Sequence, residues 1–382
     1  MNRISNVGLA ERHPPIPQTD HLAAGAVLTV DLSAIRANYR LLKQMLGTSL
    51  CAAVVKADAY GLHAATVARA LVREGCETFF VAHVTEGVSL RDTLGAGPAI
   101  YVLNGLPPGA EALCFQAGLI PVLNSEPQLL AWRGMAAAGK RKLRAAIQVD
   151  SGMARLGMSA AEIARITADP KSFDGIDVVL VMSHLARADE PLETANAAQK
   201  RNFDALIASL PRAPASLANS SGIFLGSGYH YDLARPGAAL YGINPTPGRP
   251  NPMHQVVRLE ARVIQTRHLE SGAGVGYGHT YFTNRAATLA TISLGYGDGW
   301  HRHSAAGAFF EGQRLPFIGR VSMDSIIIEI TSLPEGTLRE GDLVELIGEH
   351  QTVDDVAGHA GTIGYEVLTG LGARFHRIYK DD

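Results

Sequence analysis

The stretch AAVVKADAYG, residues 52–61, sets the fold, because small and β-branched apolar residues run without alternation into a lysine. An unbroken apolar run of this kind is typical of a strand that is buried on both faces. Lys56 ends the run, and Tyr60 follows four residues later, just before a glycine. The sequence therefore puts an amine and a phenol directly beyond the end of a buried strand.

Similar apolar runs recur up to residue 242, and helical patterns fill most of the gaps between them. These runs lie at 78–83, 99–105, 119–124, 144–150, 178–184, 215–220 and 232–242. An early helix opens behind Ser33, which we interpret as its N-cap. Buried strands that alternate with helices predict a (β/α)8 barrel, in which catalytic groups lie at the C-terminal ends of the strands. The last runs are less regular, so an open α/β sheet remains an alternative.

The pattern changes at about residue 256, where β-rich segments with partial alternation are separated by Gly and Pro turns. This pattern predicts a second, mostly antiparallel β-domain. The Pro/Gly-rich stretch 245–252, PTPGRPNP, is the natural boundary. A strand at 27–33 falls outside the barrel count, and we expect that it can pair with the β-domain. The expected divisions are a polar tail at 1–26, a barrel at 27–250 and the β-domain at 251–382.

Composition excludes several classes of function. A formal net charge of −2 gives no electrostatic attraction to nucleic acid or to acidic membranes. The 3 scattered cysteines fit a reducing compartment and indicate neither a disulfide framework nor a zinc site. We see no signal peptide and no run of transmembrane length. We therefore expect a cytoplasmic enzyme with no metal, no nucleic-acid partner and no membrane partner.

The segment AVVKADAYGLH, residues 53–63, strongly resembles the pyridoxal-phosphate-binding segment of alanine racemases. The resemblance extends from about residue 27 to the C-terminus, and its motifs stand in the family's order. They are SGMARLG (151–157), MSHLA (182–186), NSSG (219–222), RPGAALYG (235–242), VGYGHTYF (275–282), ISLGYGDG (292–299), GRVSMD (319–324) and TIGYE (362–366). The resemblance implies a TIM-like barrel followed by a β-domain. It also implies interconversion of L-alanine and D-alanine, which supplies or consumes D-alanine for peptidoglycan or amino-acid metabolism.

The same resemblance implies the cofactor-binding residues. Lys56 holds pyridoxal 5'-phosphate covalently, His184 lies beside its pyridine ring, and Arg235 faces the ring nitrogen. Because an arginine keeps its proton at working pH, that nitrogen stays unprotonated, which limits side reactions such as transamination. The residues implied around the cofactor phosphate are Tyr60, Ser220, Tyr365 and the backbone amides near Gly237 and Ala238, and Asn219 is implied as a further cofactor-binding residue.

Racemisation removes a proton from one face of Cα and returns one to the other, so two bases are expected. The resemblance implies that Lys56 is one base and that Tyr277 of a partner subunit is the other, which makes the protein a homodimer with composite sites. It also implies that Arg155 and Met323 bind the substrate carboxylate and that Tyr296 narrows the entrance.

One position departs from the family pattern. Seven residues before Arg155, family members often carry a lysine modified to a carbamate, and here that position is Gln148. A neutral amide can accept a hydrogen bond from a guanidinium, but the assistance of the charge is lost. We therefore expect activity that does not depend on carbon dioxide. The resemblance also assigns Asp189, Arg302 and Arg320 to an entrance corridor, although a surface role for each is nearly as good an interpretation.

Three other interpretations stay open. A barrel protein that only carries pyridoxal phosphate resembles the first domain alone. A basic amino acid decarboxylase places a cysteine-containing motif in the β-domain, whereas Cys51, Cys76 and Cys114 all precede it here. A broad-specificity amino acid racemase is usually exported, which does not fit a chain without a signal peptide.

Overall fold

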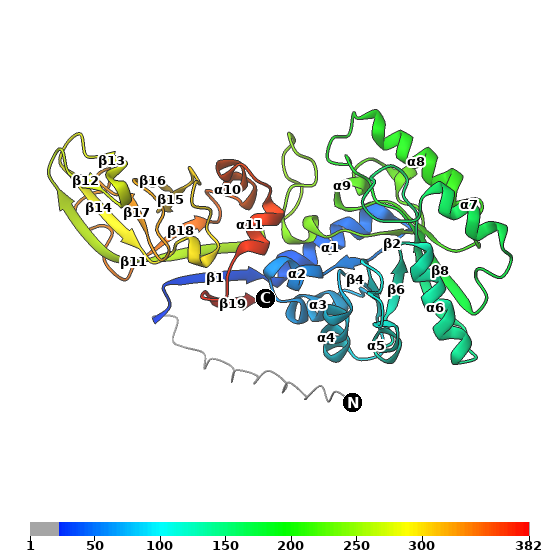
Figure 1. The fold of residues 1–382 in the computed structure, drawn as a ribbon. Helices are drawn as coiled ribbons and strands as arrows, with labels where there is room; N and C mark the ends of the chain where they lie inside the picture. The colour runs from blue at the N-terminus through cyan, green and yellow to red at the C-terminus, as the bar shows by residue number, and fades with distance from the viewer. Residues whose placement is uncertain (1–22, 382) are drawn as a thin grey trace.

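The computed structural model describes residues 23–381, so the tail expected at 1–26 falls almost entirely outside the described residues. Two parts lie side by side in Figure 1: a barrel of parallel strands wrapped by helices, and an elongated domain built on an antiparallel sheet. One cluster of buried apolar side chains extends from the barrel into the second part. Within the described residues, no helix is long and apolar enough to span a membrane.

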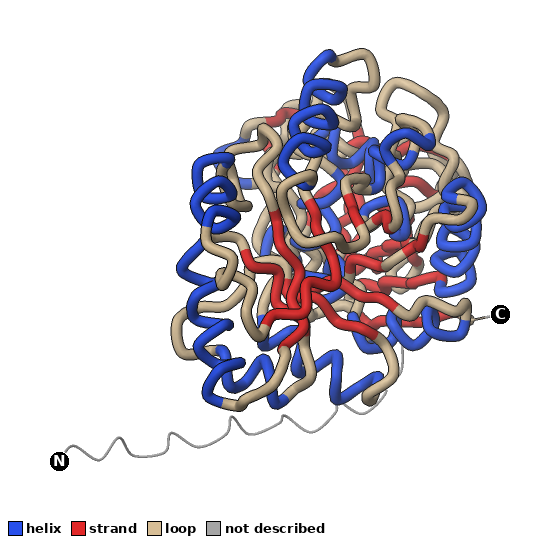
Figure 2. Tube along the Cα trace, turned by 90° about the vertical axis from the view of Figure 1, so that its right-hand side faces the viewer, coloured by secondary structure: helices blue, strands red, loops and turns tan. Residues whose placement is uncertain are grey.

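The barrel strands follow one another in chain order. They are β2 (Leu50–Cys51), β3 (Ala53–Val54), β4 (Thr78–Val81), β5 (Ala99–Val102), β6 (Ile120–Leu123), β7 (Leu143–Gln148), β8 (Ile176–Met182), β9 (Ala215–Ser216) and β10 (Leu233–Ala234). Strands β3 to β9 form one parallel sheet, and β10 pairs in parallel with β2. The amide of Asp232 donates to the carbonyl of Ala215 at 3.0 Å, which joins β10 to β9 and closes the wall. Figure 2 shows the strands at the centre of this part with helices outside them.

The run expected as a strand at 232–242 is a strand only at Leu233–Ala234. Pro236 has no amide hydrogen to donate to a ladder, so the strand cannot continue through it. A 3-10 turn, η3 (Ala238–Tyr241), follows instead. The carbonyl of Pro236 still accepts the amide of Val54 in β3 at 2.9 Å, and the chain leaves the barrel wall after this residue.

Most of the helices surround the barrel. They are α1 (Leu32–Leu46), α2 (Lys56–Gly61), α3 (Ala64–Arg73), α4 (Val84–Leu94), α5 (Glu111–Gln116), α6 (Glu126–Ala138), α7 (Ala160–Ala168), α8 (Thr194–Ile207), α9 (Ser220–Ile223) and the 3-10 turn η2 (Ser227–Tyr229). The expectation that Ser33 caps α1 is wrong. The cap is Asp31, because its carboxylate accepts the amide of Ala34 at 2.8 Å.

The second part is a mostly antiparallel sheet. Its strands are β1 (Ala26–Asp31), β11 (Val257–Leu269), β14 (Ala287–Ile292), β15 (Gly307–Phe310), β16 (Gln313–Pro316), β17 (Ile326–Glu329), β18 (Leu343–Ile347) and β19 (His376–Lys380). The long strand β11 pairs with β1, β14 and β18, all antiparallel, and β1 also pairs in parallel with β19. The first strand of the described chain thus lies within the sheet of the β-domain.

Smaller elements complete this part at its two ends. They are β12 (Gly274–Val275), η4 (Tyr277–His279), β13 (Tyr281–Phe282), η5 (Tyr296–Asp298), α10 (Val353–Ala360) and α11 (Gly364–Gly370). Figure 1 places α10 and α11 next to the barrel, whereas the β12–β13 hairpin lies at the far end of the sheet. Only the near end of the β-domain can therefore reach a site on the barrel of its own chain.

Candidate active site

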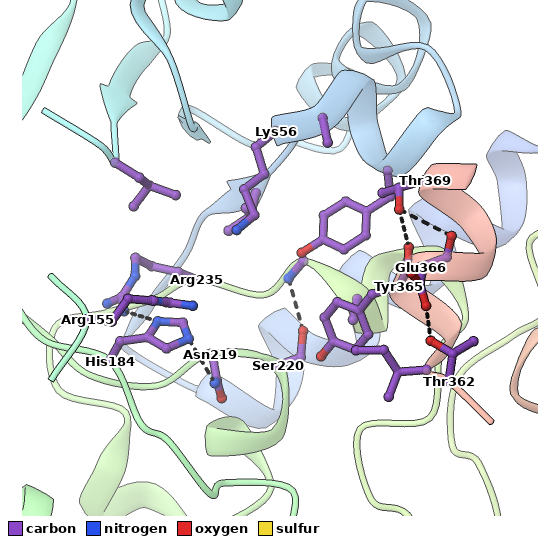
Figure 3. Close-up of a pocket in the computed structure, with 17 residues that line it drawn as sticks. Lys56, Arg155, His184, Asn219, Ser220, Arg235, Thr362, Tyr365, Glu366 and Thr369 are labelled. Carbon is purple, nitrogen blue, oxygen red and sulfur yellow. Dashed lines mark hydrogen bonds between the residues drawn. The ribbon is translucent and has the colours of Figure 1, made fainter. Parts of the chain in front are cut away.

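A cavity of about 560 Å³ opens where the barrel strands end. Its volume lies within the usual range for small-molecule sites. The barrel contributes most of its wall, and the segment around α11 closes the remaining side (Figure 3). The lining residues are Val54, Lys56, Ala57, Tyr60, Leu103, Arg155, His184, Asn219, Ser220, Arg235, Gly237, Ala238, Thr362, Ile363, Tyr365, Glu366 and Thr369.

Lys56 and Tyr60 reach this cavity from an unusual backbone. The four residues Ala57 to Tyr60 have φ of 52–57°, so the middle of α2 is a left-handed helical turn, and none of these four residues is a glycine. For L-residues this conformation costs roughly 1–2 kcal/mol each. Residues four apart on a helical turn share one face, which brings the amine and the phenol to the same cavity.

The environment of Lys56 favours the neutral amine. Burial lowers the pKa of Lys56, the positive charge of Arg155 lowers it further, and the negative charge of Glu86 opposes both. Figure 3 shows the amine pointing into the cavity toward Arg235. A neutral amine is the form that attacks a carbonyl group, so the position suits a covalent link to an aldehyde.

Arg235 is buried at the base of the cavity, with 3% of its surface exposed. It donates to the carbonyl of Ser183 at 2.6 Å and to the hydroxyl of Ser216, and it lies 3.5 Å from Nδ1 of His184. Burial lowers the pKa of Arg235 to about 9, which leaves it charged at neutral pH.

His184 is a neutral imidazole in this environment. Burial and the positive charges of Arg235, Arg155 and Lys56, in that order, lower the pKa of His184 to about 3. Nε2 of the ring lies 3.5 Å from Nδ2 of Asn219, and Oδ1 of Asn219 accepts the amide of Gly222 at 2.9 Å. The imidazole therefore presents a flat and uncharged surface beside the arginine.

Hydroxyl groups converge at the other end of the cavity. The Ser220 hydroxyl oxygen accepts the amides of Gly237 at 3.0 Å and Ala239 at 3.2 Å, which leaves its hydrogen free to donate. A Cβ added at Gly237 would lie 2.5 Å from the Tyr60 hydroxyl, so only glycine lets that phenol come so close. The rings of Tyr60 and Tyr365 are 5.8 Å apart. Three hydroxyl donors beside the start of a 3-10 turn suit an anion.

Arg155 lines the cavity from the loop that follows β7. Asp150 organises this loop, because Oδ1 of its carboxylate accepts the amides of Gly152 and Met153, both at 2.9 Å. Burial would raise the pKa of Asp150, but hydrogen bonds from these backbone amides hold it below its usual value. Gln148 is buried within β7, and the lining of the cavity does not include it. Sequence reasoning missed the role of Asp150, which the D-S-G spacing before Arg155 could have indicated as a turn.

Three predicted residues lie outside the cavity, all in the β-domain. Tyr277, Met323 and Tyr296 are 70%, 54% and 41% exposed. Tyr277 belongs to η4, between β12 and β13, at the end of the sheet that Figure 1 places far from the barrel. Within one chain, none of these three side chains lines the cavity.

The β-domain contributes further residues that sequence reasoning did not single out. The cavity around α11 is also lined by Thr362, Ile363, Glu366 and Thr369. From this segment sequence reasoning had singled out only Tyr365, within the motif TIGYE. Of the residues assigned to an entrance corridor, Arg302 and Arg320 line a separate cavity of about 370 Å³ in the β-domain.

The fold and the cavity together define a barrel protein whose site combines a buried lysine with a second, β-rich domain. Comparison with known proteins identifies the family. The family models described as "Alanine racemase, N-terminal domain" and "Alanine racemase, C-terminal domain" match residues 30–245 and 256–379. The chain belongs to the alanine racemase family.

Individual relatives agree over nearly the whole length. A protein of Mesorhizobium japonicum described as "Alanine racemase, catabolic" is 65% identical over 94% of both chains. An alanine racemase of Brucella canis is 50% identical over the same shares. The crystal structure of alanine racemase from Bartonella henselae, with covalently bound pyridoxal phosphate, matches with a TM-score of 0.90 and 44% identity, over 94% of this chain and 100% of that one.

Proposed function

We propose that this protein interconverts L-alanine and D-alanine, using pyridoxal 5'-phosphate held by Lys56 and a second base, Tyr277, from another copy of the chain. The observation that carries the proposal is the cavity in which a lysine of lowered pKa faces a buried arginine at one end and a group of hydroxyls at the other. The Bartonella henselae relative carries the same cofactor covalently, which supports the choice.

The residues present fit this cofactor. Its aldehyde belongs at the Lys56 amine, and its phosphate belongs among the hydroxyls of Tyr60, Ser220 and Tyr365, where the close approach at Gly237 leaves room for no larger side chain. The amide of Ala238 starts η3 and has no acceptor within that turn, so it is a further donor for the phosphate. Asn219 and His184 line the wall between the two ends.

When bound, the cofactor withdraws electrons from the bond between the substrate Cα and its hydrogen. The protein must then move the proton. The Lys56 amine, with its lowered pKa, takes or returns a proton on one face of Cα. Arg235 stays charged beneath the ring end of the cavity, so a neighbouring ring nitrogen gains no proton there. Arg155 offers a planar pair of donors to the substrate carboxylate.

The opposite face of Cα needs another base, and we assign this role to Tyr277 of a second copy. Tyr277 is exposed and distant from the barrel of its own chain, while Met323 and Tyr296 are exposed in the same domain. A homodimer in which each β-domain covers the partner's barrel would bury these side chains against the cavity. Met323 would then face the substrate carboxylate, and Tyr296 would narrow the entrance.

The substitution Lys56→Ala tests the proposal. The variant should form no borohydride-reducible adduct with pyridoxal phosphate and should not exchange the Cα hydrogen of alanine with deuterated solvent. Lys142→Ala, at an exposed lysine far from the cavity, is the matched control and should keep both properties. A reducible adduct that persists in the Lys56 variant would show that another residue anchors the cofactor.

Assays with amino acid substrates distinguish the proposed function from the two remaining alternatives, a pure cofactor carrier and a broad-specificity racemase. A pure cofactor carrier would not exchange the Cα hydrogen, and the match to the C-terminal racemase domain argues against one. A screen of alanine, serine, arginine and lysine distinguishes a narrow racemase from a broad one. We expect alanine to be turned over fastest by at least about ten-fold, since serine adds a hydroxyl, and arginine and lysine add a long charged chain, to the methyl group that the pocket must accept.

We further propose that the enzyme acts mainly in the consumption of alanine. The support is the Mesorhizobium japonicum relative, which is described as catabolic and is 65% identical. A cell that lacks the enzyme should then grow poorly on alanine as its carbon source without requiring added D-alanine for its wall. A requirement for D-alanine would assign the enzyme to peptidoglycan supply instead.

A further inference from the structure

We propose that Glu86 is a positioning residue, whose carboxylate holds the left-handed turn that carries Lys56 and Tyr60 and so sets where the lysine amine stands. The inference deepens the proposed function, since it rests on Lys56 being the group that binds the cofactor.

The turn needs an external support. Ala57 to Tyr60 all have positive φ, and neither alanine can hydrogen-bond through its side chain to relieve that conformation. A strained backbone of this kind persists only where its surroundings over-determine it. The question is therefore which contacts hold the turn in place.

Glu86 links the first amide of the turn to the barrel wall. Its Oε1 accepts the amide of Ala57 at 2.7 Å. Its Oε2 accepts the amides of Ala82 at 2.7 Å and His83 at 3.1 Å, directly beyond strand β4. Each of these bonds has a charged acceptor, which makes it stronger than a bond between neutral groups. The residue that follows Lys56 is thus fixed to the neighbouring strand by one carboxylate.

Arg377 supports the other end of the turn. From β19 it donates through Nη1 to the carbonyl of Gly61 at 2.6 Å and through Nη2 to the carbonyl of Gly372 at 3.0 Å. The two charged side chains come from different parts of the fold, Glu86 from the barrel and Arg377 from the β-domain. Lys56, Ala57 and Tyr60, the residues of α2 that line the cavity, thus lie at or next to these two attachment points.

Glu86 also acts on the Lys56 amine through its charge. Burial and Arg155 lower the pKa of Lys56, and Glu86 raises it against them. Arg377 is not among the groups that shift this pKa. Loss of Glu86 should therefore lower the pKa of the amine as well as loosen the turn, whereas loss of Arg377 should only loosen the turn. The titratable and charged groups that face Lys56 around the cavity are Tyr60, Glu86, Arg155, His184, Arg235, Tyr365 and Glu366.

The test uses full-length protein without cofactor and compares Glu86→Gln with Glu162→Gln. Glu162 is a matched control, because its carboxylate caps α7 through Ser159 in the same way and lies away from the cavity. The first readout is hydrogen exchange of the peptide that contains residues 57–61. The second is the pH midpoint at which acetic anhydride labels Lys56, followed by mass spectrometry.

In Glu86→Gln, exchange of this peptide should speed up at least about ten-fold, and the labelling midpoint should fall by on the order of one pH unit. Glu162→Gln should change neither. Arg377→Gln should speed up exchange and leave the midpoint unchanged, and it serves as the test of support if Glu86→Gln does not fold. With cofactor bound, kcat of Glu86→Gln should fall by on the order of 10- to 100-fold, the usual cost of misplacing a reacting group.

Wild-type exchange and an unchanged labelling midpoint in Glu86→Gln would overturn the inference, and so would wild-type exchange in Arg377→Gln where Glu86→Gln does not fold. Because both readouts are taken without cofactor or substrate, they remain valid if Lys56→Ala shows that the proposed function is wrong.

Discussion

Arg235 determines the electrostatic character of the cavity. It is buried, it hydrogen-bonds Ser183 and Ser216, and it stays charged at neutral pH. Its charge contributes to keeping His184 neutral. Any basic nitrogen placed beside it would meet the same repulsion, since a nearby like charge disfavours the protonated form. One arginine thus keeps the ring end of the cavity free of further protons.

The substitution Arg235→Glu should reverse that effect. A carboxylate beside the ring nitrogen would favour its protonation, so more of the amino group should pass to the cofactor, and racemisation should slow by at least about ten-fold. The measurement is the ratio of pyridoxamine phosphate formed to alanine racemised. Arg235→Lys keeps the charge and is the control. An unchanged ratio in both variants would mean that residue 235 does not contact the ring.

His184 makes the stability of the cofactor-free protein depend on pH in a defined direction. Its pKa falls from 6.5 to about 3 on folding, chiefly through burial. Between these values the unfolded chain binds a proton that the folded chain does not. The free energy of unfolding should therefore fall as the pH drops below about 6.5, by at most about 1.4 kcal/mol per pH unit for this group.

Urea unfolding of wild type and His184→Asn at pH 7 and pH 5 measures this dependence. Each protein loses some free energy of unfolding between pH 7 and pH 5. Because the other titrating groups are common to both proteins, the difference between the two losses reports the contribution of His184. The variant should lose less stability between the two pH values than wild type does. Equal losses in the two proteins would show that the imidazole titrates normally in the folded state.

The left-handed turn α2 depends on Gly61 as well as on its two charged supports. Gly61 has φ of +82°, and a Cβ at this position would lie 2.7 Å from the backbone carbonyl oxygen of Leu368 in α11. Gly61→Ala should therefore destabilise the protein by roughly 2–3 kcal/mol, the sum of a disfavoured φ and a backbone clash. Gly361→Ala is the control, since φ there is +68° with nothing within 4 Å, and it should cost only about 1 kcal/mol. Chemical denaturation compares the two, and equal losses would show that α11 does not constrain the turn.

These elements also show how far the sequence could predict the structure. The unbroken apolar runs predicted the barrel strands, because burial on both faces leaves a pattern that can be read locally. The left-handed turn at 57–60 could not be foreseen, since its alanines would ordinarily favour a right-handed helix and its supports, Glu86 and Arg377, are distant in sequence. Likewise, Pro236 shortens β10, and only the structure shows where the chain goes next.

The predicted site residues also differ in how far the sequence alone could place them. Those near the barrel strand ends, such as Lys56, His184 and Arg235, come together in the cavity, because the fold gathers strand ends at one edge. Whether a residue of the β-domain reaches the cavity depends on how that domain is placed against the barrel. Tyr365 reaches the cavity within the chain, whereas Tyr277 does not, and the two motifs alone could not show this difference.

At the scale of the whole molecule, the proposed role of Tyr277 requires a second copy of the chain. If it serves one face of Cα, Tyr277→Phe should slow racemisation by about 10² to 10⁴, the usual contribution of a general acid or base. The loss should be asymmetric, because Lys56 still serves the other face. In the proposed assignment Tyr277 acts on L-alanine and Lys56 on D-alanine, so exchange of the Cα hydrogen of D-alanine with deuterated solvent should persist while that of L-alanine collapses. An equal loss for both enantiomers would contradict the assignment of one base to each face.

A mixing experiment tests whether the two bases come from different chains. Lys56→Ala and Tyr277→Phe homodimers should each be nearly inactive, because each of their sites lacks one base. Exchange of subunits creates heterodimers in which one site carries both defects and the other carries none. Up to about half of the wild-type activity per heterodimer should therefore return, since one of its two sites is intact. Figure 1 agrees with this proposal, because the β12–β13 hairpin, which carries η4 and Tyr277, lies at the end of the sheet far from the barrel of its own chain. If heterodimers verified by mass spectrometry recover no activity, Lys56 and Tyr277 work within one chain and the composite site is wrong.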